Sequence, residues 1–130
     1  MTHLRISEAA RLLGVSPDTI RRWLDSGRLA EAQAGHGPRA VDGASLAALM
    51  AEQAPPAAAP HTSARNRISG IVIRVERDGV MALVEIQAGP YRLASLMSRE
   101  SADALGLEPG VLAAAVIKST NVIVELEEFR

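Results

Sequence analysis

The stretch SEAARLLGVSPDTIRRWLDSGRL, residues Ser7–Leu29, carries the start and stop signals of two short helices joined by a tight turn. Ser7 is the expected N-cap of the first helix, and Gly14 is expected to end it, because a helix C-terminus favours a residue that tolerates left-handed geometry. Ser16 is the expected N-cap of the second helix, with Pro17 at its first position. The pattern predicts a helix-turn-helix.

The second predicted helix, which Gly27 closes, has one apolar and one polar face. Ile20, Trp23 and Leu24 recur at i, i+3 and i+4, so we expect them to be buried against the first helix. The residues left facing outward or to the flank are Thr19, Arg21 and Arg22. An exposed arginine pair is usually only a solvated surface, so a DNA-binding interpretation depends on the whole arrangement of caps, turn, tryptophan and glycines.

Residues 4–53 resemble the MerR and excisionase-like group of winged helix-turn-helix domains. The resemblance rests on ISEAARLLGVSPDTIRRW, then SGRL, then GHGPRAVDGASLAAL. It implies that Pro17–Leu24 is the recognition helix in the major groove of double-stranded DNA. It also implies that Arg39, on the loop Gly35–Gly43, is a wing residue that touches the DNA backbone or minor groove. The DNA-binding residues implied are Pro17, Asp18, Thr19, Arg21, Arg22 and Arg39.

Within that set, the arginines would bind phosphates, while Asp18 and Thr19 are placed to contact base edges. The segment carries six basic and six acidic residues, so its electrostatic field is weak. We therefore expect a monomer to bind DNA poorly and an assembly of several copies to be needed.

The chain divides at QAPPAAAPHT, Gln53–Thr62, where prolines disfavour a helix and favour an extended spacer. We expect two domains, residues 1–53 and 63–130, joined by a linker over residues 54–62. Without cysteine there is no disulfide or thiolate metal site, and the three histidines lack ligand-spaced neighbours, which disfavours a zinc centre. Neither a signal peptide nor a membrane-spanning segment is expected, which predicts a soluble cytoplasmic protein without a membrane partner.

After the linker, period-two alternation predicts strands. RISGIVIRVER and GVMALVEIQAG flank an Asp78-Gly79 turn, and YRLASLMS follows as a third strand. A short helix, capped by Ser98 and closed by Gly106, separates it from two last strands, GVLAAAVIK and NVIVELEEF. The whole chain is therefore predicted to be α+β, with a small winged helix-turn-helix domain followed by a five-stranded OB-like β-barrel. Eight basic against nine acidic residues and few aromatics disfavour nucleic-acid binding by the barrel.

Lys118 is the only lysine, since 13 of the 14 basic residues are arginine, and it lies in AVIKST. The presence of lysine and not arginine at this position has two explanations. It is either chance at a strand end, or a need for a compact charge that a planar guanidinium cannot supply. IKST together with SARN, about fifty residues earlier, resembles the Mop or TOBE molybdate-binding domain over Ser63 to roughly Leu126. The resemblance implies that the oxyanion-binding residues are Ser63, Ala64, Arg65, Ser98, Lys118, Ser119 and Thr120. Such barrels form dimers and often hexamers, with anion sites across subunit contacts.

The implied ligand fits these residue types. Molybdate and tungstate are dianions that accept hydrogen bonds and donate none, so their site needs donors only: hydroxyls, backbone N–H groups and one or two cations. SARN and KST contain no carboxylate. The alternative is that the Ser and Thr side chains merely cap a turn.

We therefore expect a molybdate- or tungstate-responsive, DNA-binding transcriptional regulator without an organic cofactor. The alternative is an intracellular molybdate-binding or storage protein whose helical module does not bind DNA. An enzyme is disfavoured, because the sequence shows no nucleophile–base arrangement, phosphate-cradling glycine loop or metal cage.

Overall fold

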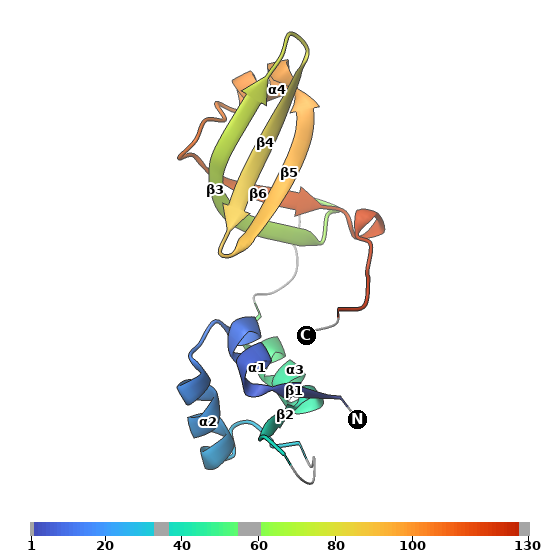
Figure 1. Cartoon of the computed structure of the whole chain (residues 1–130). Helices are drawn as coiled ribbons and strands as arrows, with labels where there is room; N and C mark the ends of the chain where they lie inside the picture. Colours follow the sequence, from blue (N-terminus) through green and yellow to red (C-terminus); the bar gives the residue numbers. More distant parts are fainter. Residues whose placement is uncertain (1, 33–36, 55–60, 128–130) are drawn as a thin grey trace. The chain divides into compact units, whose positions relative to one another are not determined.

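The computed structural model describes residues 2–32, 37–54 and 61–127. The chain divides into two compact units within the proline-rich segment (Figure 1). Residues 55–60 of the predicted linker, 54–62, lie outside the described residues. Among the described residues, every helix is too short or too polar to cross a lipid bilayer.

The first unit packs three helices beside a small antiparallel sheet. Its elements are β1 (His3–Arg5), α1 (Ile6–Leu13), α2 (Pro17–Ser26), β2 (Ala40–Asp42) and α3 (Gly43–Gln53). The strands β1 and β2 pair with each other. The predicted helix-turn-helix corresponds to α1 and α2. The winged form stays a prediction, because residues 33–36 of the predicted wing loop lie outside the described residues.

The caps of α2 and the end of α1 follow the sequence prediction. The hydroxyl oxygen of Ser16 accepts a hydrogen bond from the Thr19 backbone N–H (3.2 Å), and Pro17 opens the helix. Gly14 and Gly27 end α1 and α2 in the left-handed conformation, at φ 69° and 83°. These local signals therefore fix both ends of α2 and the C-terminal end of α1.

The start of α1 differs from the prediction, which was wrong to make Ser7 the N-cap. The helix begins at Ile6, its N-cap is Arg5, and Ser7 lies in the first turn. The cause is the pairing of β1 with β2, which keeps the chain extended as far as Arg5. Arg5 then bonds through its side chain to Glu8, three residues on, where a hydroxyl cap was expected.

The core of the first unit includes a third helix that was not predicted from the sequence. Ile20 is fully buried and Leu24 nearly so, as expected, whereas Trp23 is only half-buried, with the Arg28 guanidinium 4.6 Å from its ring centroid. The third helix, α3, completes this core. The buried residues are Ala9, Ala10, Ile20, Leu24, Leu29, Val41, Leu46 and Leu49. A signal for α3 was present, since the Asp42 carboxylate accepts from the Ser45 N–H at 3.1 Å as an N-cap.

The second unit is a curled antiparallel sheet with one short helix (Figure 1). Its elements are β3 (Asn66–Arg77), β4 (Met81–Ala88), β5 (Tyr91–Ser98), α4 (Arg99–Ala104), β6 (Leu112–Ile117) and a 3-10 turn over Ser119–Asn121. Within the described residues the strand order is β5-β4-β3-β6. This half-barrel is consistent with an OB-like fold. Its buried side chains are Val72, Ala82, Val84, Ile86, Ala102 and Leu107.

The predicted fifth strand does not form over the part of it that the structure describes, residues 121–127. Residues 122–127 are described and adopt no secondary structure, and Ile123, Val124 and Leu126 are 88%, 86% and 98% exposed. The 3-10 turn directs the chain away from β6, so this segment pairs with neither edge of the sheet (Figure 1). Alternation in the sequence was correctly observed, but a strand also needs a partner edge.

The long strand β3 changes partner at its middle, and Gly70 makes the change possible. Residues Asn66–Ile71 pair with β6, and Ile71–Arg77 pair with β4. A Cβ atom at Gly70 would lie 2.3 Å from the carbonyl oxygen of Gln87, which is too close for any side chain. A glycine inside a strand commonly marks such a close approach of two backbones.

Gly70→Ala is therefore expected to lower the free energy of unfolding of the second unit by about 1–3 kcal/mol, the usual cost of overpacking. Gly79→Ala is the matched control, because a Cβ there meets no atom within 4 Å. Urea denaturation measures both. Equal stability of the two variants would contradict the role assigned to Gly70.

Candidate functional site

The first pair of residues in the β3–β6 ladder brings the SARN and IKST segments together. Asn66, the first residue of β3, pairs with Ile117, the last of β6. Ser63–Arg65 immediately precede this pair and Lys118–Thr120 immediately follow it. The side-chain amide of Asn66 also donates to the Ile117 carbonyl oxygen at 3.1 Å, across 51 positions of sequence. The two segments therefore meet at one end of the sheet.

This end of the sheet offers hydrogen-bond donors and no carboxylate from either motif. Lys118, Ser119 and Thr120 are exposed, and among the described residues their side chains make no hydrogen bond or ion pair. The hydroxyls of Ser119 and Thr120 are thus not used as turn caps. The 3-10 turn is closed instead by backbone bonds, such as Asn121 N–H to the Lys118 carbonyl oxygen at 2.9 Å.

The SARN segment is shaped by its own contacts. Ala64 is buried, and its backbone N–H donates to the Thr62 hydroxyl at 3.2 Å. The Arg65 guanidinium donates to the Thr62 carbonyl oxygen at 3.0 Å, which turns part of that side chain back along its own loop. Ser63 is exposed. The segment is thus held in a defined conformation, with a hydroxyl and part of a guanidinium left as donors.

The polar face of α2 carries the predicted DNA-binding side chains, and most are paired with one another. Arg21 donates to the Asp18 carboxylate at 2.7 Å and Arg22 to the Thr19 hydroxyl at 3.1 Å. Both arginines are exposed, and the Asp18 side chain is 88% exposed. Surface pairs of this kind contribute little to stability, so they can exchange partners at low cost.

Arg39, the predicted wing residue, is held by two carboxylates. Its guanidinium contacts Glu31 at 2.8 and 3.0 Å and Asp25 at 3.0 Å. These hydrogen bonds, first from Glu31 and then from Asp25, raise the pKa of Arg39 above its usual value. The side chain is therefore oriented by Nε and one terminal nitrogen, and the acids leave the other terminal nitrogen free for a DNA phosphate.

Both units match known families. A model described as a TOBE domain matches residues 62–124, and one described as a helix-turn-helix domain matches residues 4–54. A probable molybdenum-pterin-binding protein of Haemophilus influenzae is 41% identical over 66 residues, which are 50% of this chain and 96% of that protein. The chain belongs to the TOBE family. Its TOBE domain follows an N-terminal helix-turn-helix domain.

Two further proteins are similar to the TOBE domain. Molybdenum-pterin-binding protein 3 of Clostridium pasteurianum is 40% identical over 63 residues, 48% of this chain and 93% of that protein. A solved structure of a molybdate-binding protein from Sporomusa ovata is 26% identical, covers 50% of this chain and 97% of its own, and superposes with a TM-score of 0.49.

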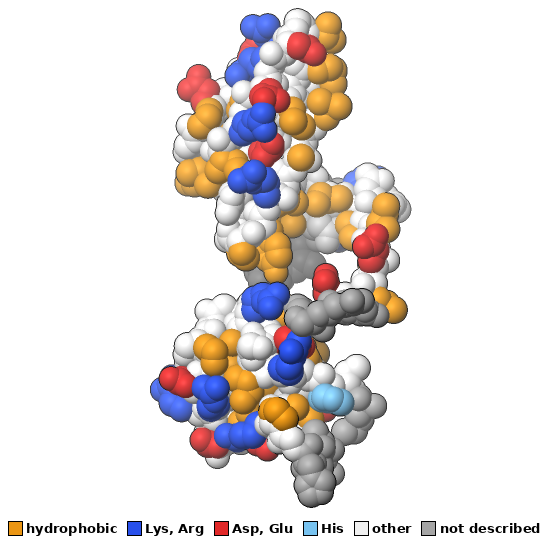
Figure 2. All heavy atoms as spheres, viewed as in Figure 1, with side chains coloured by type: hydrophobic (Ala, Val, Ile, Leu, Met, Phe, Trp, Pro, Cys, Tyr) orange, Lys and Arg blue, Asp and Glu red, His pale blue; other side chains and the backbone are white. Residues whose placement is uncertain are grey.

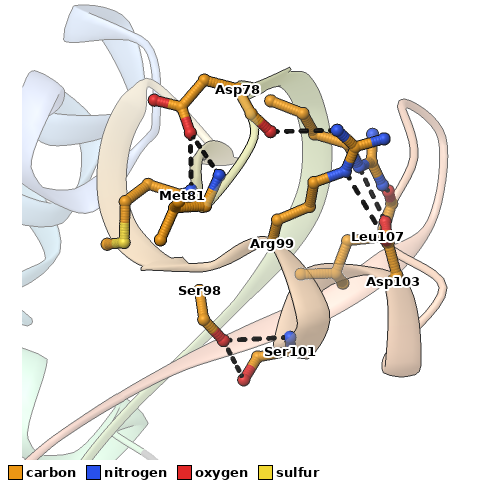
Figure 3. Close-up of polar contacts among 9 residues, drawn as sticks. Asp78, Met81, Ser98, Arg99, Ser101, Asp103 and Leu107 are labelled. Carbon is orange, nitrogen blue, oxygen red and sulfur yellow. Dashed lines mark hydrogen bonds and ion pairs between the residues drawn. The ribbon is translucent and has the colours of Figure 1, made fainter.

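Ser98 lies at the other end of the TOBE sheet from SARN and IKST. It pairs with Met81, beside the end of β3 at Arg77, and β3 is 12 residues long. At about 3.3 Å per residue, the two ends of β3 are roughly 35 Å apart along the strand. Ser98 is also engaged as the N-cap of α4, where its hydroxyl accepts from the Ser101 N–H at 3.1 Å and donates to the Ser101 hydroxyl at 2.8 Å (Figure 3).

The surroundings of Ser98 do not form a donor-only cluster in one chain. The nearby guanidinium of Arg99 donates to the Asp78 carbonyl oxygen at 3.0 Å, and Arg77 donates to Asp103 at 2.9 Å (Figure 3). The Asp78 carboxylate accepts from the N–H groups of Met81 and Val80, which lower its pKa. The structure therefore brings six of the seven predicted oxyanion residues to one end and leaves Ser98 at the opposite end.

Asn66 is the last residue of SARN, and no role was predicted for it from the sequence. The structure makes it the residue that ties the two motif segments together, because both its backbone and its side chain contact Ile117. The available signal was the position of an amide residue next to a predicted strand start. Within the described residues, no group of three or more His, Asp or Glu side chains gathers as a metal-binding cluster.

Proposed function

We propose that this protein is a molybdate- or tungstate-responsive DNA-binding regulator of transcription that acts in the cytoplasm, where the DNA is. The observation that carries the proposal is the meeting of SARN and IKST at the Asn66–Ile117 pair. Support comes from the relatives named as molybdenum-pterin-binding proteins, whose whole length the TOBE domain nearly covers. The helix-turn-helix domain supplies the second half of the proposal.

A tetrahedral oxyanion suits the donors at this end of the sheet. The Lys118 ammonium supplies a compact positive charge, and the hydroxyls of Ser63, Ser119 and Thr120 supply donors. Backbone N–H groups at a strand-end loop add to such a site. Molybdate has no proton to donate, so a site without carboxylates selects it over protonated phosphate. Arg65 adds the N–H groups that its bond to the Thr62 carbonyl oxygen leaves free. Ala64 belongs to the proposed set through its backbone N–H, which would exchange the Thr62 hydroxyl for the anion.

The inorganic anion is the better ligand for this chain, although its relatives carry the word pterin in their names. A pterin ring stacks on aromatic side chains. Among the described residues of the TOBE domain the only aromatic one is Tyr91, which is 65% exposed. That residue offers one face and no enclosed stacking pocket.

We also propose that several copies assemble, because the half-barrel leaves the edges of its sheet open. An apolar groove of about 270 Å³ runs between β5 and β6, the two edges of the half-barrel. Leu93, Met97, Leu105 and Leu107 are among its lining residues. The exposed segment Val122–Leu126 has the alternating apolar side chains that such a groove accepts. A second copy can therefore supply the missing strand, which satisfies an open sheet edge and buries apolar surface at the same time.

Ser98 then enters the proposed site from a second copy. Within one chain it lies at the opposite end of β3 from Lys118, so only a site shared between chains can contain both. Such a site couples ligand binding to assembly, because the anion binds the assembled form and stabilises it.

The oxyanion site is tested by the double variant Lys118→Ala with Ser119→Ala. Loss of two charge-assisted hydrogen bonds is expected to weaken molybdate binding by about a hundredfold or more. Calorimetry with molybdate, tungstate, sulfate and phosphate measures the affinities, and circular dichroism verifies the fold. Arg74→Ala is the control, since Arg74 pairs with Glu76 and Glu85 in the middle of the sheet. Unchanged molybdate affinity in the double variant would show that the site lies elsewhere.

The DNA-binding half is tested by Arg22→Ala. Loss of one phosphate contact is expected to weaken binding about tenfold, while molybdate affinity stays at the wild-type value. Gel-shift titration of promoter DNA, with and without molybdate, gives both the affinity and the response to the anion. A wild-type protein that binds molybdate but no DNA would leave the storage function as the correct one.

Assembly is tested by removing residues 122–130. Without this exposed segment, light scattering after size exclusion should show a fall from an oligomer to the monomer mass. Val80→Asp is the control, because Val80 is 72% exposed but lies in the β3–β4 turn. An oligomer that survives the truncation would contradict strand exchange.

A further inference from the structure

Three arginines from separate segments of the first unit line one shallow groove. Its volume is about 410 Å³, and it lies where the first turns of α1 and α2 meet the residues before β2. Its lining residues are Arg5, Ile6, Ser7, Pro17, Arg21, Pro38 and Arg39. No acidic residue is among them, although the unit as a whole has as many acidic as basic residues. Figure 2 shows both signs interspersed over one face of this unit.

Each arginine of the groove is held by an acid but keeps donors. Glu8 engages the Nε atom of Arg5, Asp18 engages one terminal nitrogen of Arg21, and the acids beside Arg39 engage two of its nitrogens. A guanidinium carries five N–H groups, so each retains N–H groups for a further acceptor. The ion pairs thus orient the three cations and leave part of each free to bind an anion.

The groove also receives the positive ends of two helices. Ser7 is the second residue of α1, and Pro17 is the first residue of α2. Backbone N–H groups in the first turn of α1 have no partner within the helix, and the helix dipole favours an anion there. The exposed Ser7 hydroxyl adds one more donor. Cations, N–H groups and a hydroxyl from three segments therefore converge on one place.

We propose that this groove on the protein binds a phosphate of the DNA backbone, next to the major groove of the DNA in which α2 would lie. Arg5 and Ser7 would then be phosphate contacts in addition to Arg21 and Arg39. The inference rests on the proposed DNA binding and deepens it. A phosphate held at the start of both helices fixes the position of α2 on the duplex, whatever the base sequence. The carboxylates that pair with the arginines neutralise most of the positive charge around the groove. Phosphate binding therefore depends on the geometry of the remaining N–H donors.

The decisive variant is Ser7→Asp. An acidic residue in the first turn suits the helix dipole, so α1 should fold at least as well as before. The new charge repels a phosphate in the groove, so binding to a duplex should weaken about tenfold or more. Ala44→Asp is the matched control, because Ala44 is exposed and is also the second residue of its helix, α3, outside the groove. It should change the affinity less than about twofold.

Arg5→Gln gives an independent measurement. A phosphate contact does not depend on sequence, so the probe is an arbitrary duplex of about 20 base pairs, titrated by fluorescence anisotropy at several NaCl concentrations. The slope of log affinity against log salt should fall by about 0.9 when one phosphate contact is lost. Arg74→Gln, which removes the same charge from the second unit, should leave the slope unchanged. Thermal unfolding of each variant confirms that it is folded.

The outcomes separate this inference from the function on which it rests. If Arg22→Ala weakens DNA binding but Ser7→Asp behaves like Ala44→Asp, the groove is not a phosphate site and the regulator proposal survives. If the wild-type protein does not bind the duplex at low salt, either with or without molybdate, both proposals are overturned. If Ser7→Asp weakens binding, Ala44→Asp does not, and Arg5→Gln lowers the salt slope, the groove is established as a contact to the DNA backbone.

Discussion

The antiparallel pairing of β3 with β6 is the contact on which the chemistry of the TOBE domain depends. It joins segments 51 positions apart at one pair of residues, Asn66 and Ile117, so that SARN and IKST end up side by side. Ordering a residue costs about 1–2 kcal/mol in backbone entropy. A donor cluster is therefore cheaper to build at strand ends that the sheet already orders than on two free loops. Gly70 supports this pairing, because it lets β3 pair with β6 over its first half and with β4 over its second half.

Charge balance governs the first unit in a comparable way. Its arginines are oriented by neighbouring acids, as Arg39 is by Glu31 and Asp25, so little of the positive charge acts at long range. Surface ion pairs are weak, and a phosphate can displace one partner where the geometry is favourable. As the proposed DNA-binding domain, this unit would bind through the shape of its contacts more than through its net charge, and we expect single copies to bind weakly.

The two proposals are linked through assembly. In the proposed regulator, a strand from a second copy fills the open edge, Ser98 joins Lys118 across the contact, and two DNA-binding domains are held together. Two linked binding domains gain affinity from their high effective concentration without any new contact. In this proposal the anion stabilises the assembled state, and the assembled state is the one that binds DNA well.

Features that depend on neighbours along the chain could be predicted from the sequence alone. These are the cap of α2 at Ser16, the left-handed glycines, the Asp78-Gly79 turn, the Ser98 cap and the identity of both families. The folded chain was needed for four further features: the start of α1, the lack of a fifth barrel strand over the described residues 122–127, the role of Asn66 and the distance of Ser98 from Lys118. Caps and turns are set by bonds that span a few residues, whereas strand partners and edges are set by contacts between distant segments, which a local pattern does not contain.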